Sequence, residues 1–130
     1  MEKTLTTGIL GKKSIKVTEQ MTADKVGSGL LQVFATPSMI ALCEQCASES
    51  VQEYLEEGTC TVGTLVNIKH IAATPIGMTV KCQSILKEID RKRLVFDIEV
   101  FDEKEKIGEG THERFIVTNQ KFMDKVNSKI

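Results

Sequence analysis

One acidic residue, Glu44, stands in a stretch of the chain where apolar residues recur at helical spacing. A rotation of about 100° per residue places Glu44 on the apolar arc, between Val51 and Leu55. The other acidic residues of the stretch fall on the polar arc or at its end. Desolvation disfavours an ionised carboxylate, so an acid in this position needs a partner or a chemical role. Glu44 is therefore a candidate nucleophile or general base, although a salt bridge or a wet interface explains the pattern equally well.

Thr36 stands immediately before Pro37, at the expected start of the same helix. Threonine is a common N-cap and proline is favoured at the first helical position, so capping alone accounts for this pair. A helix start also supplies unpaired N–H groups and the positive end of the dipole, which can hold an oxyanion or a phosphate. Thr36 is therefore the second candidate residue.

The spacing of the two candidates restricts how they can act together. Thr36 and Glu44 are eight positions apart, which is roughly 12 Å along one helix. One helix cannot direct both side chains at the same carbonyl group. A composite site, with Thr36 from one subunit and Glu44 from another, removes this difficulty and requires at least a dimer.

Two histidines and one arginine complete the polar candidates. His70 falls at the end of an expected strand, in phase with Val62, Val66 and Ile68, where a lone histidine is more often a satisfied core residue than a catalyst.

His112 and Arg114 lie together late in the last expected strand. Arg114 can pair with an acid or a phosphate, and an ion pair within the sheet is the more common case.

The four cysteines are expected to be free thiols. Cys43 and Cys46 form a C-x-x-C, but in the middle of the helix and on its apolar face, which favours two small buried hydrophobic residues. Cys60 and Cys82 are isolated, so a zinc site is not expected. The chain also has no glycine-rich phosphate loop and no serine elbow.

The elements that must position these residues follow from periodicity. A helix is predicted from Thr36 to Glu57, ending at Gly58, with Leu42 as the one apolar residue on the polar side. Before it come a strand over 13–21 and a loop over 22–32. After it the period changes from 3.6 to 2. The expected later strands are 61–71, 78–87, 94–100 and 107–117, followed by a tail over 121–130.

Sequential strands joined by short turns pair as antiparallel neighbours. A single helix can be wrapped by such a sheet, so we predict an α+β hotdog fold in which an antiparallel sheet surrounds one long helix. The whole chain, 1–130, is expected to form this one domain. The exposed edge strand and the exposed part of the helix both favour a dimer.

Composition narrows the classes of partner. The chain has 130 residues, with 17 Lys and Arg against 18 Asp and Glu, a net charge of −1 and 5% aromatic residues. Neither a basic field nor a stacking platform is available, so nucleic-acid binding is not expected. No segment is long and apolar enough to span a membrane, and the N-terminus does not resemble a signal peptide, so we expect a cytoplasmic protein.

Five segments of the chain form a specific pattern in this order. They are Val33-Phe34-Ala35-Thr36-Pro37 with Met39-Ile40 and Glu44; Gly63-Thr64; His70 with Ala72-Ala73-Thr74-Pro75 and Gly77; Gly110-Thr111-His112-Glu113-Arg114; and Lys121-Phe122 with Lys125-Val126. From Val33 to the C-terminus, the chain resembles the fluoroacetyl-CoA-thioesterase-like hotdog proteins.

The resemblance implies a homodimeric acyl-CoA thioesterase with a Thr/Glu/His constellation, which falls here on Thr36, Glu44 and His70. It also implies that Gly63 lies close to the acyl group and Arg114 near the site. In this interpretation His70 polarises or deprotonates the attacking group, Glu44 is a general base or a nucleophile, and Thr36 attacks or positions water.

The segment before Val33 departs from the family pattern. The fluoroacetyl-CoA enzyme has aromatic and apolar lid residues there, whereas this chain has Gly27 and Leu30. We expect Leu30 and Phe34 to contact the substrate, and we do not assign the fluoroacetyl group to this chain.

The predicted function is hydrolysis of a short acyl-CoA to the free acid and CoA, without a metal or redox cofactor, since CoA enters as part of the substrate. The alternative is a protein that binds acyl-CoA or a small acyl ligand without turnover. A hydratase is disfavoured because its His and Asp pair is not seen. The sequence leaves open the acyl group, direct water attack or an acyl-enzyme, and a dimer or a tetramer.

Overall fold

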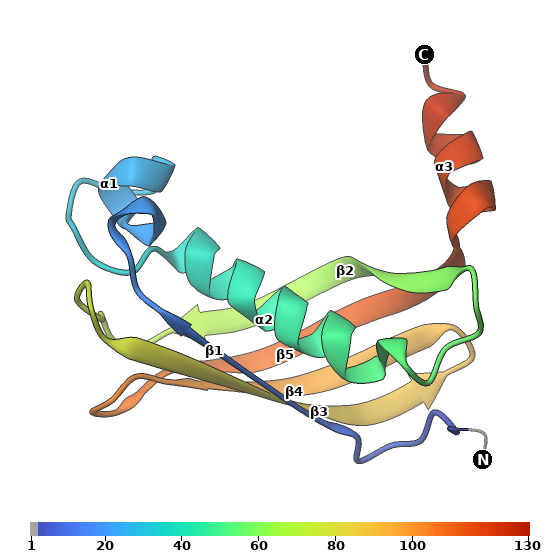
Figure 1. Ribbon diagram of the computed structural model, residues 1–130, viewed down its shortest axis with the longest axis horizontal. Coiled ribbons are helices and arrows are strands. Elements are labelled where there is room, and N and C mark those ends of the chain that lie inside the picture. The colour runs from blue at the N-terminus through green and yellow to red at the C-terminus, as the bar shows by residue number, and fades with distance from the viewer. Residues whose placement is uncertain (1–2) are drawn as a thin grey trace.

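A five-stranded antiparallel sheet curls around one long helix, α2 (Figure 1). The computed structural model describes residues 3–130. The sheet has the order β1-β3-β4-β5-β2, so that β1 and β2 are its edges. The elements are β1 (Leu10–Lys16), the 3-10 turn η1 (Glu19–Met21), α1 (Ala23–Val26), α2 (Thr36–Gln52), β2 (Thr59–His70), β3 (Thr79–Asp90), β4 (Arg93–Phe101), β5 (Lys106–Thr118) and α3 (Asn119–Asn127).

Helix α2 is covered more widely than its sequence pattern predicts. It contacts β1 and β3 on one side and β2 on the other. Leu42, predicted to lie on the polar side, is only 2% exposed, and the prediction for this residue is wrong. A curled sheet buries more of the helix circumference than a flat one, so a residue outside the main apolar arc still enters the core. Cys43 and Cys46 are buried in the same core, as expected.

The helix ends at Gln52, five residues before the predicted end. The chain then makes two tight turns, in which Tyr54 N donates to Val51 O (2.9 Å) and Leu55 N donates to Gln52 O (3.2 Å). Gln52 Nε2 also donates to the carbonyl oxygen of Thr59 at the start of β2 (2.9 Å). Gly58, with φ of 83°, turns the chain into the strand rather than ending the helix.

Two strands differ from the predicted pattern. The first strand covers Leu10–Lys16 instead of 13–21, because the chain leaves the sheet after Lys16 and forms η1. In β2, a bulge between Gly63 and Leu65 shifts the pairing with β5. An extra residue reverses the alternation of faces, so Val62 does not share a face with Val66, contrary to the prediction. His70 stays in phase with Val66.

The C-terminal segment, whose structure is not predicted from the sequence, forms helix α3. It contacts β5 and extends beyond the β2 edge of the sheet (Figure 1). Its apolar side chains Phe122, Met123 and Val126 are exposed in the single chain. Within residues 3–130, none of the helices combines the length and the apolar character needed to cross a bilayer.

The burial of Leu42 predicts a large difference between two neighbouring substitutions on α2. Leu42→Ala should lower the free energy of unfolding by about 2–5 kcal/mol, because it removes buried methyl groups and leaves a cavity. Gln45→Ala, on the exposed side, should change it by about 0.5 kcal/mol or less. Urea unfolding measures both values, and equal losses would contradict the packing described here.

Candidate active site

The start of α2 brings the hydroxyl of Thr36 to the imidazole of His70. The N-cap of α2 is Ala35, and Thr36 is already the first helical residue, so the predicted N-cap role of Thr36 is wrong. Its side chain instead reaches the end of β2, where Oγ1 lies 2.8 Å from His70 Nδ1. A hydroxyl within hydrogen-bond distance of an imidazole is the arrangement of a nucleophile and its base.

The residues around His70 hold its ring so that Nδ1 is directed at Thr36. The ring of Phe34 meets it edge-on, with centroids 6.4 Å apart and planes at 78°. Phe34 itself is buried and its backbone N donates to Thr74 O (2.9 Å). Phe34, predicted to bind substrate, contacts the imidazole and also lines the hollow beside it, so its predicted role stays a prediction.

Burial sets the protonation of His70. Desolvation lowers its pKa below the ordinary value of 6.5, and a hydrogen-bonding contribution from the Ala72 backbone acts in the opposite direction. His70 Nε2 is buried and has no hydrogen-bond partner among residues 3–130. The ring is therefore neutral at pH 7 and can accept a proton at Nδ1 from the Thr36 hydroxyl.

A hollow of about 370 Å³ adjoins this pair, lined in part by Ser28, Ala35 and Ala72. The first turn of a helix has N–H groups without intrahelical acceptors, and the first intrahelical bond of α2 runs from Met39 N to Ala35 O (3.0 Å). Pro37 has no N–H, so the N–H groups of this turn belong to Thr36, which lines the hollow, and to Ser38. They are candidate donors to a negatively charged oxygen. Leu30, predicted to bind substrate, is 93% exposed and does not line the hollow in this single chain.

Glu44 lies apart from this pair, against β2 and β5. Its Oε2 is 3.5 Å from NH1 of Arg114, and its side chain is 42% exposed. The apolar surroundings predicted for Glu44 are therefore not present within a single chain. A Cβ atom on Gly63 would lie 2.5 Å from Glu44 Oε2, so a larger residue at this point of β2 would displace the carboxylate from its present position.

Arg114 is buried although it is charged, with a 6% exposed surface. Its Nε donates to Thr61 Oγ1 (2.7 Å) and its NH2 donates to Thr61 O (2.9 Å). Its NH1 lies 3.2 Å from Nε2 of His112. These contacts use the donors of a guanidinium that would otherwise be costly to bury.

No role is predicted for Thr61, and His112 is predicted to lie beside Arg114 without a function. One signal for His112 was available: residues two apart on a strand share a face, so His112 and Arg114 must point the same way. No comparable signal marks Thr61, because its contact with Arg114 depends on the pairing of β2 with β5.

The structure thus contains two groups of candidate residues on the helix side of the sheet. Thr36 and His70 form one, and Glu44, Gly63 and Arg114 form the other. Since α2 is a continuous helix from Thr36 to Gln52, its two candidates remain roughly 12 Å apart along the axis. The roles predicted for all of these residues stay predictions.

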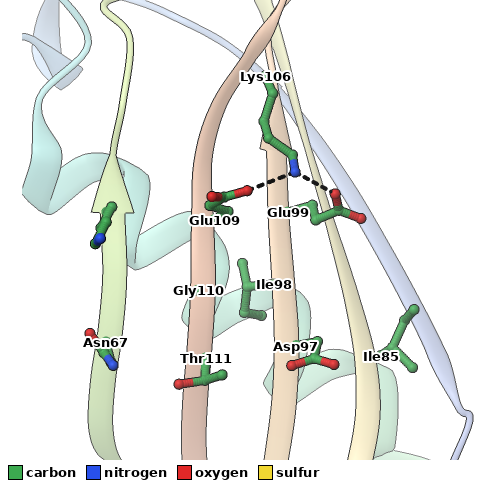
Figure 2. Close-up of a pocket in the computed structure, with 10 residues that line it drawn as sticks. Asn67, Ile85, Asp97, Ile98, Glu99, Lys106, Glu109, Gly110 and Thr111 are labelled. Carbon is green, nitrogen blue, oxygen red and sulfur yellow. Dashed lines mark hydrogen bonds and ion pairs between the residues drawn. The ribbon is translucent and has the colours of Figure 1, made fainter.

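A larger hollow, of about 490 Å³, lies on the opposite face of the sheet (Figure 2). There Lys106 Nζ pairs with Glu99 Oε2 and Glu109 Oε1, each at 2.8 Å. Lys106 is thus paired with two carboxylates of its own surface. None of the candidate residues lines this hollow, so its size alone does not make it the functional site.

An antiparallel sheet curled around one long helix is the hotdog fold. A hot-dog-like protein from Thermanaerovibrio acidaminovorans superposes with a TM-score of 0.87 at 20% identity, covering 95% of this chain and 92% of that one.

Closer relatives identify the family. Residues 17–120 match the family described as fluoroacetyl-CoA-specific thioesterase. The fluoroacetyl-CoA thioesterase of Streptantibioticus cattleyicolor is 38% identical over 98 residues, or 75% of this chain and 70% of that protein. The structure of the fluoroacetyl-CoA thioesterase FlK has a TM-score of 0.92 at 30% identity, covering 97% of this chain and 98% of that one. The chain therefore belongs to this thioesterase family, as the sequence predicted.

The burial of His70 predicts an acid-shifted titration. In a ¹⁵N-detected imidazole titration, His70 should change protonation at a pH below 6.5, because burial destabilises its cation. Thr36→Val should shift the Nδ1 resonance by removing the hydroxyl, whereas Thr36→Ser should preserve it. A titration midpoint at or above 6.5, or identical spectra for the two variants, would contradict this geometry.

Proposed function

We propose that this protein hydrolyses a short acyl-CoA to the free acid and CoA. The observation that carries the proposal is the hydroxyl–imidazole pair of Thr36 and His70, 2.8 Å apart at a helix start, in a chain of the thioesterase family. The relatives are named for fluoroacetyl-CoA. Rates of hydrolysis measured on a panel of acyl-CoA compounds that includes acetyl-CoA and fluoroacetyl-CoA would identify the acyl group of this chain's substrate.

The chemistry begins at Thr36 Oγ1. The attacking oxygen is that of Thr36, or of a water that Thr36 positions, and the proton it loses passes to Nδ1 of neutral His70. The N–H groups at the start of α2 stabilise the negative charge that develops on the carbonyl oxygen. The C–S bond then breaks, and the departing CoA sulfur takes the proton held by His70 to become the thiol, which leaves His70 neutral again. If Thr36 carries the acyl group, a water molecule releases it as the acid.

Glu44 enters this reaction from a second copy of the chain. Thr36 and Glu44 are eight positions apart on one rigid helix, so a homodimer is needed to bring Glu44 of one copy to Thr36 of the other. We propose that the two copies meet at the β2 edge, where residues 63–67 are exposed. An antiparallel pairing of the two β2 strands would set the Gly63 region of one copy beside the His70 end of the other.

Helix α3 supports the same assembly. It extends beyond the β2 edge, on the side where a second copy would add, and it carries exposed apolar side chains (Figure 1). A second copy would cover Phe122 and Val126, which otherwise remain in contact with water. An exposed edge strand also favours association with a second strand, because its outward backbone N–H and C=O groups have no partner strand.

In this proposal the reaction uses no metal ion and no redox cofactor, and CoA enters as part of the substrate. Thr36 and His70 supply a hydroxyl and an imidazole base, and Glu44 of the second copy supplies a further general base or nucleophile. We place the enzyme in the cytoplasm, which suits its four free cysteines.

Single substitutions test the catalytic assignment. Glu44→Gln, His70→Ala and Thr36→Ala should each lower kcat/KM for the preferred acyl-CoA by about 100-fold or more, since each removes a group that acts in the transition state. Release of acid is followed by mass spectrometry, because the protein's own cysteines react with thiol reagents. Addition of EDTA should leave the wild-type rate unchanged. Wild-type kcat/KM in Glu44→Gln and His70→Ala would refute these roles, and tight binding without product would favour a binding protein.

Mixing two inactive variants tests the composite site. A heterodimer of Thr36→Ala and Glu44→Gln contains one site in which both residues are intact. An equimolar mixture that is co-refolded should therefore recover about a quarter of the wild-type activity, since about half of the dimers are mixed and each has one working site. A site confined to one chain gives no recovery, and that result would overturn the shared arrangement. Two Thr36→Ala chains mixed with each other provide the control.

A further inference from the structure

His112 is a fully buried histidine whose two ring nitrogens are both in contact with polar groups. It has no exposed surface. Nδ1 lies 2.8 Å from the carbonyl oxygen of Leu65 on β2. Nε2 lies 3.2 Å from NH1 of Arg114. The ring stacks on Phe96, with centroids 6.3 Å apart and planes at 30°.

The chemistry of these two partners fixes the position of the ring proton. A carbonyl oxygen only accepts hydrogen bonds, so Nδ1 must carry the proton and donate it to Leu65 O. A guanidinium only donates, so Nε2 must be unprotonated and accept from Arg114. The structure is therefore consistent with a single state of His112, the neutral tautomer protonated on Nδ1.

All three nitrogens of the Arg114 guanidinium contact residues other than Glu44. Its Nε and NH2 donate to Thr61, and its NH1 is shared between His112 Nε2 at 3.2 Å and Glu44 Oε2 at 3.5 Å. The nitrogen NH1 of Arg114 therefore contacts both the acceptor on His112 and the carboxylate of Glu44. The ring can set where this nitrogen, and hence the Glu44 oxygen, is placed.

We propose that His112 is a positioning residue, which holds the guanidinium of Arg114 so that Arg114 fixes the Glu44 carboxylate over Gly63. This inference rests on the role proposed for Glu44. His112 itself does not touch the substrate. It acts by presenting a lone pair to Arg114, and a protonated ring would present an N–H and a positive charge instead.

The surroundings of His112 keep it neutral. Burial lowers its pKa below 6.5, the nearby Arg114 lowers it further, and the Leu65 carbonyl, Glu44 and Glu113 act in the opposite direction. The folded-state pKa is thus below the unfolded value, so protonation favours the unfolded chain. The stability that depends on neutral His112 is complete above about pH 6.5 and is lost as the pH falls toward the folded-state pKa.

Two substitutions separate the hydrogen bonds that His112 makes. An asparagine amide can take the place of Nδ1 and donate to Leu65 O, but it does not reach Arg114. A glutamine can place an oxygen near the position of Nε2 and accept from Arg114. We expect His112→Asn to lower kcat by about 10-fold or more with little change in KM, because a small displacement of a reacting group costs this much. His112→Gln should stay within about threefold of the wild type.

A double-mutant cycle connects the effect to Glu44. If His112 acts through Glu44, His112→Asn should have almost no further effect on kcat in the Glu44→Gln background. A purely structural role predicts equal losses for Asn and Gln that also persist in that background, and this result would overturn the proposal. A wild-type kcat/KM in Glu44→Gln alone would instead refute the proposed function, which keeps the two failures distinct.

A measurement on the wild-type protein does not depend on whether the variants fold. Long-range ¹H–¹⁵N spectra distinguish a protonated nitrogen from an unprotonated one in each imidazole. His112 should show a protonated Nδ1 and an unprotonated Nε2 at pH 7. A spectrum with the proton on Nε2, or with both nitrogens protonated, would overturn the proposal.

Discussion

The fixed rise of helix α2 is the constraint on which the arrangement of the site depends. Because α2 runs without interruption from Thr36 to Gln52, its two candidate residues, Thr36 and Glu44, cannot approach each other within one chain. The sheet supplies a different partner to each of the two residues: His70 at the end of β2 meets Thr36 at the start of the helix, and Arg114 on β5 meets Glu44 at its middle. Both partners come from the paired strands β2 and β5 at one edge of the sheet, which run along the helix and reach it at two different heights.

The two histidines have different hydrogen-bond partners, and these partners determine whether each ring can transfer a proton. Burial lowers the pKa of both, and both are neutral at pH 7. His70 faces a hydroxyl through Nδ1, a contact that can run in either direction and can therefore carry a proton. His112 faces a carbonyl and a guanidinium, partners that each allow one direction only. A proton can move at His70, whereas at His112 the same ring has one fixed donor and one fixed acceptor. The difference lies in the partners and not in the degree of burial.

The sequence predicted the elements that depend on local periodicity, and failed where the outcome depended on distant partners. The long helix and the strands that follow it are found close to their predicted places, and the architecture was inferred from their order. Thr36 was assigned as an N-cap because its local neighbours suffice for that role. Its actual partner, His70, is 34 positions away. Leu42 was assigned to the polar side because a helical wheel does not contain the curl of the sheet. The contact of Thr61 with Arg114 spans 53 positions, and it depends on the register of two strands.

The bulge in β2 is the feature that brings the two groups of residues onto one side of the sheet. Gly63 and His70 are seven positions apart, and in a regular strand an odd separation puts two residues on opposite faces. The extra residue between Gly63 and Leu65 corrects this difference, so the glycine under Glu44 and the histidine beside Thr36 both face α2. Bulges often re-aim side chains next to active sites. Here a regular strand could place either Gly63 beneath Glu44 or His70 beside Thr36, but not both. The single inserted residue allows β2 to face both the start and the middle of the helix.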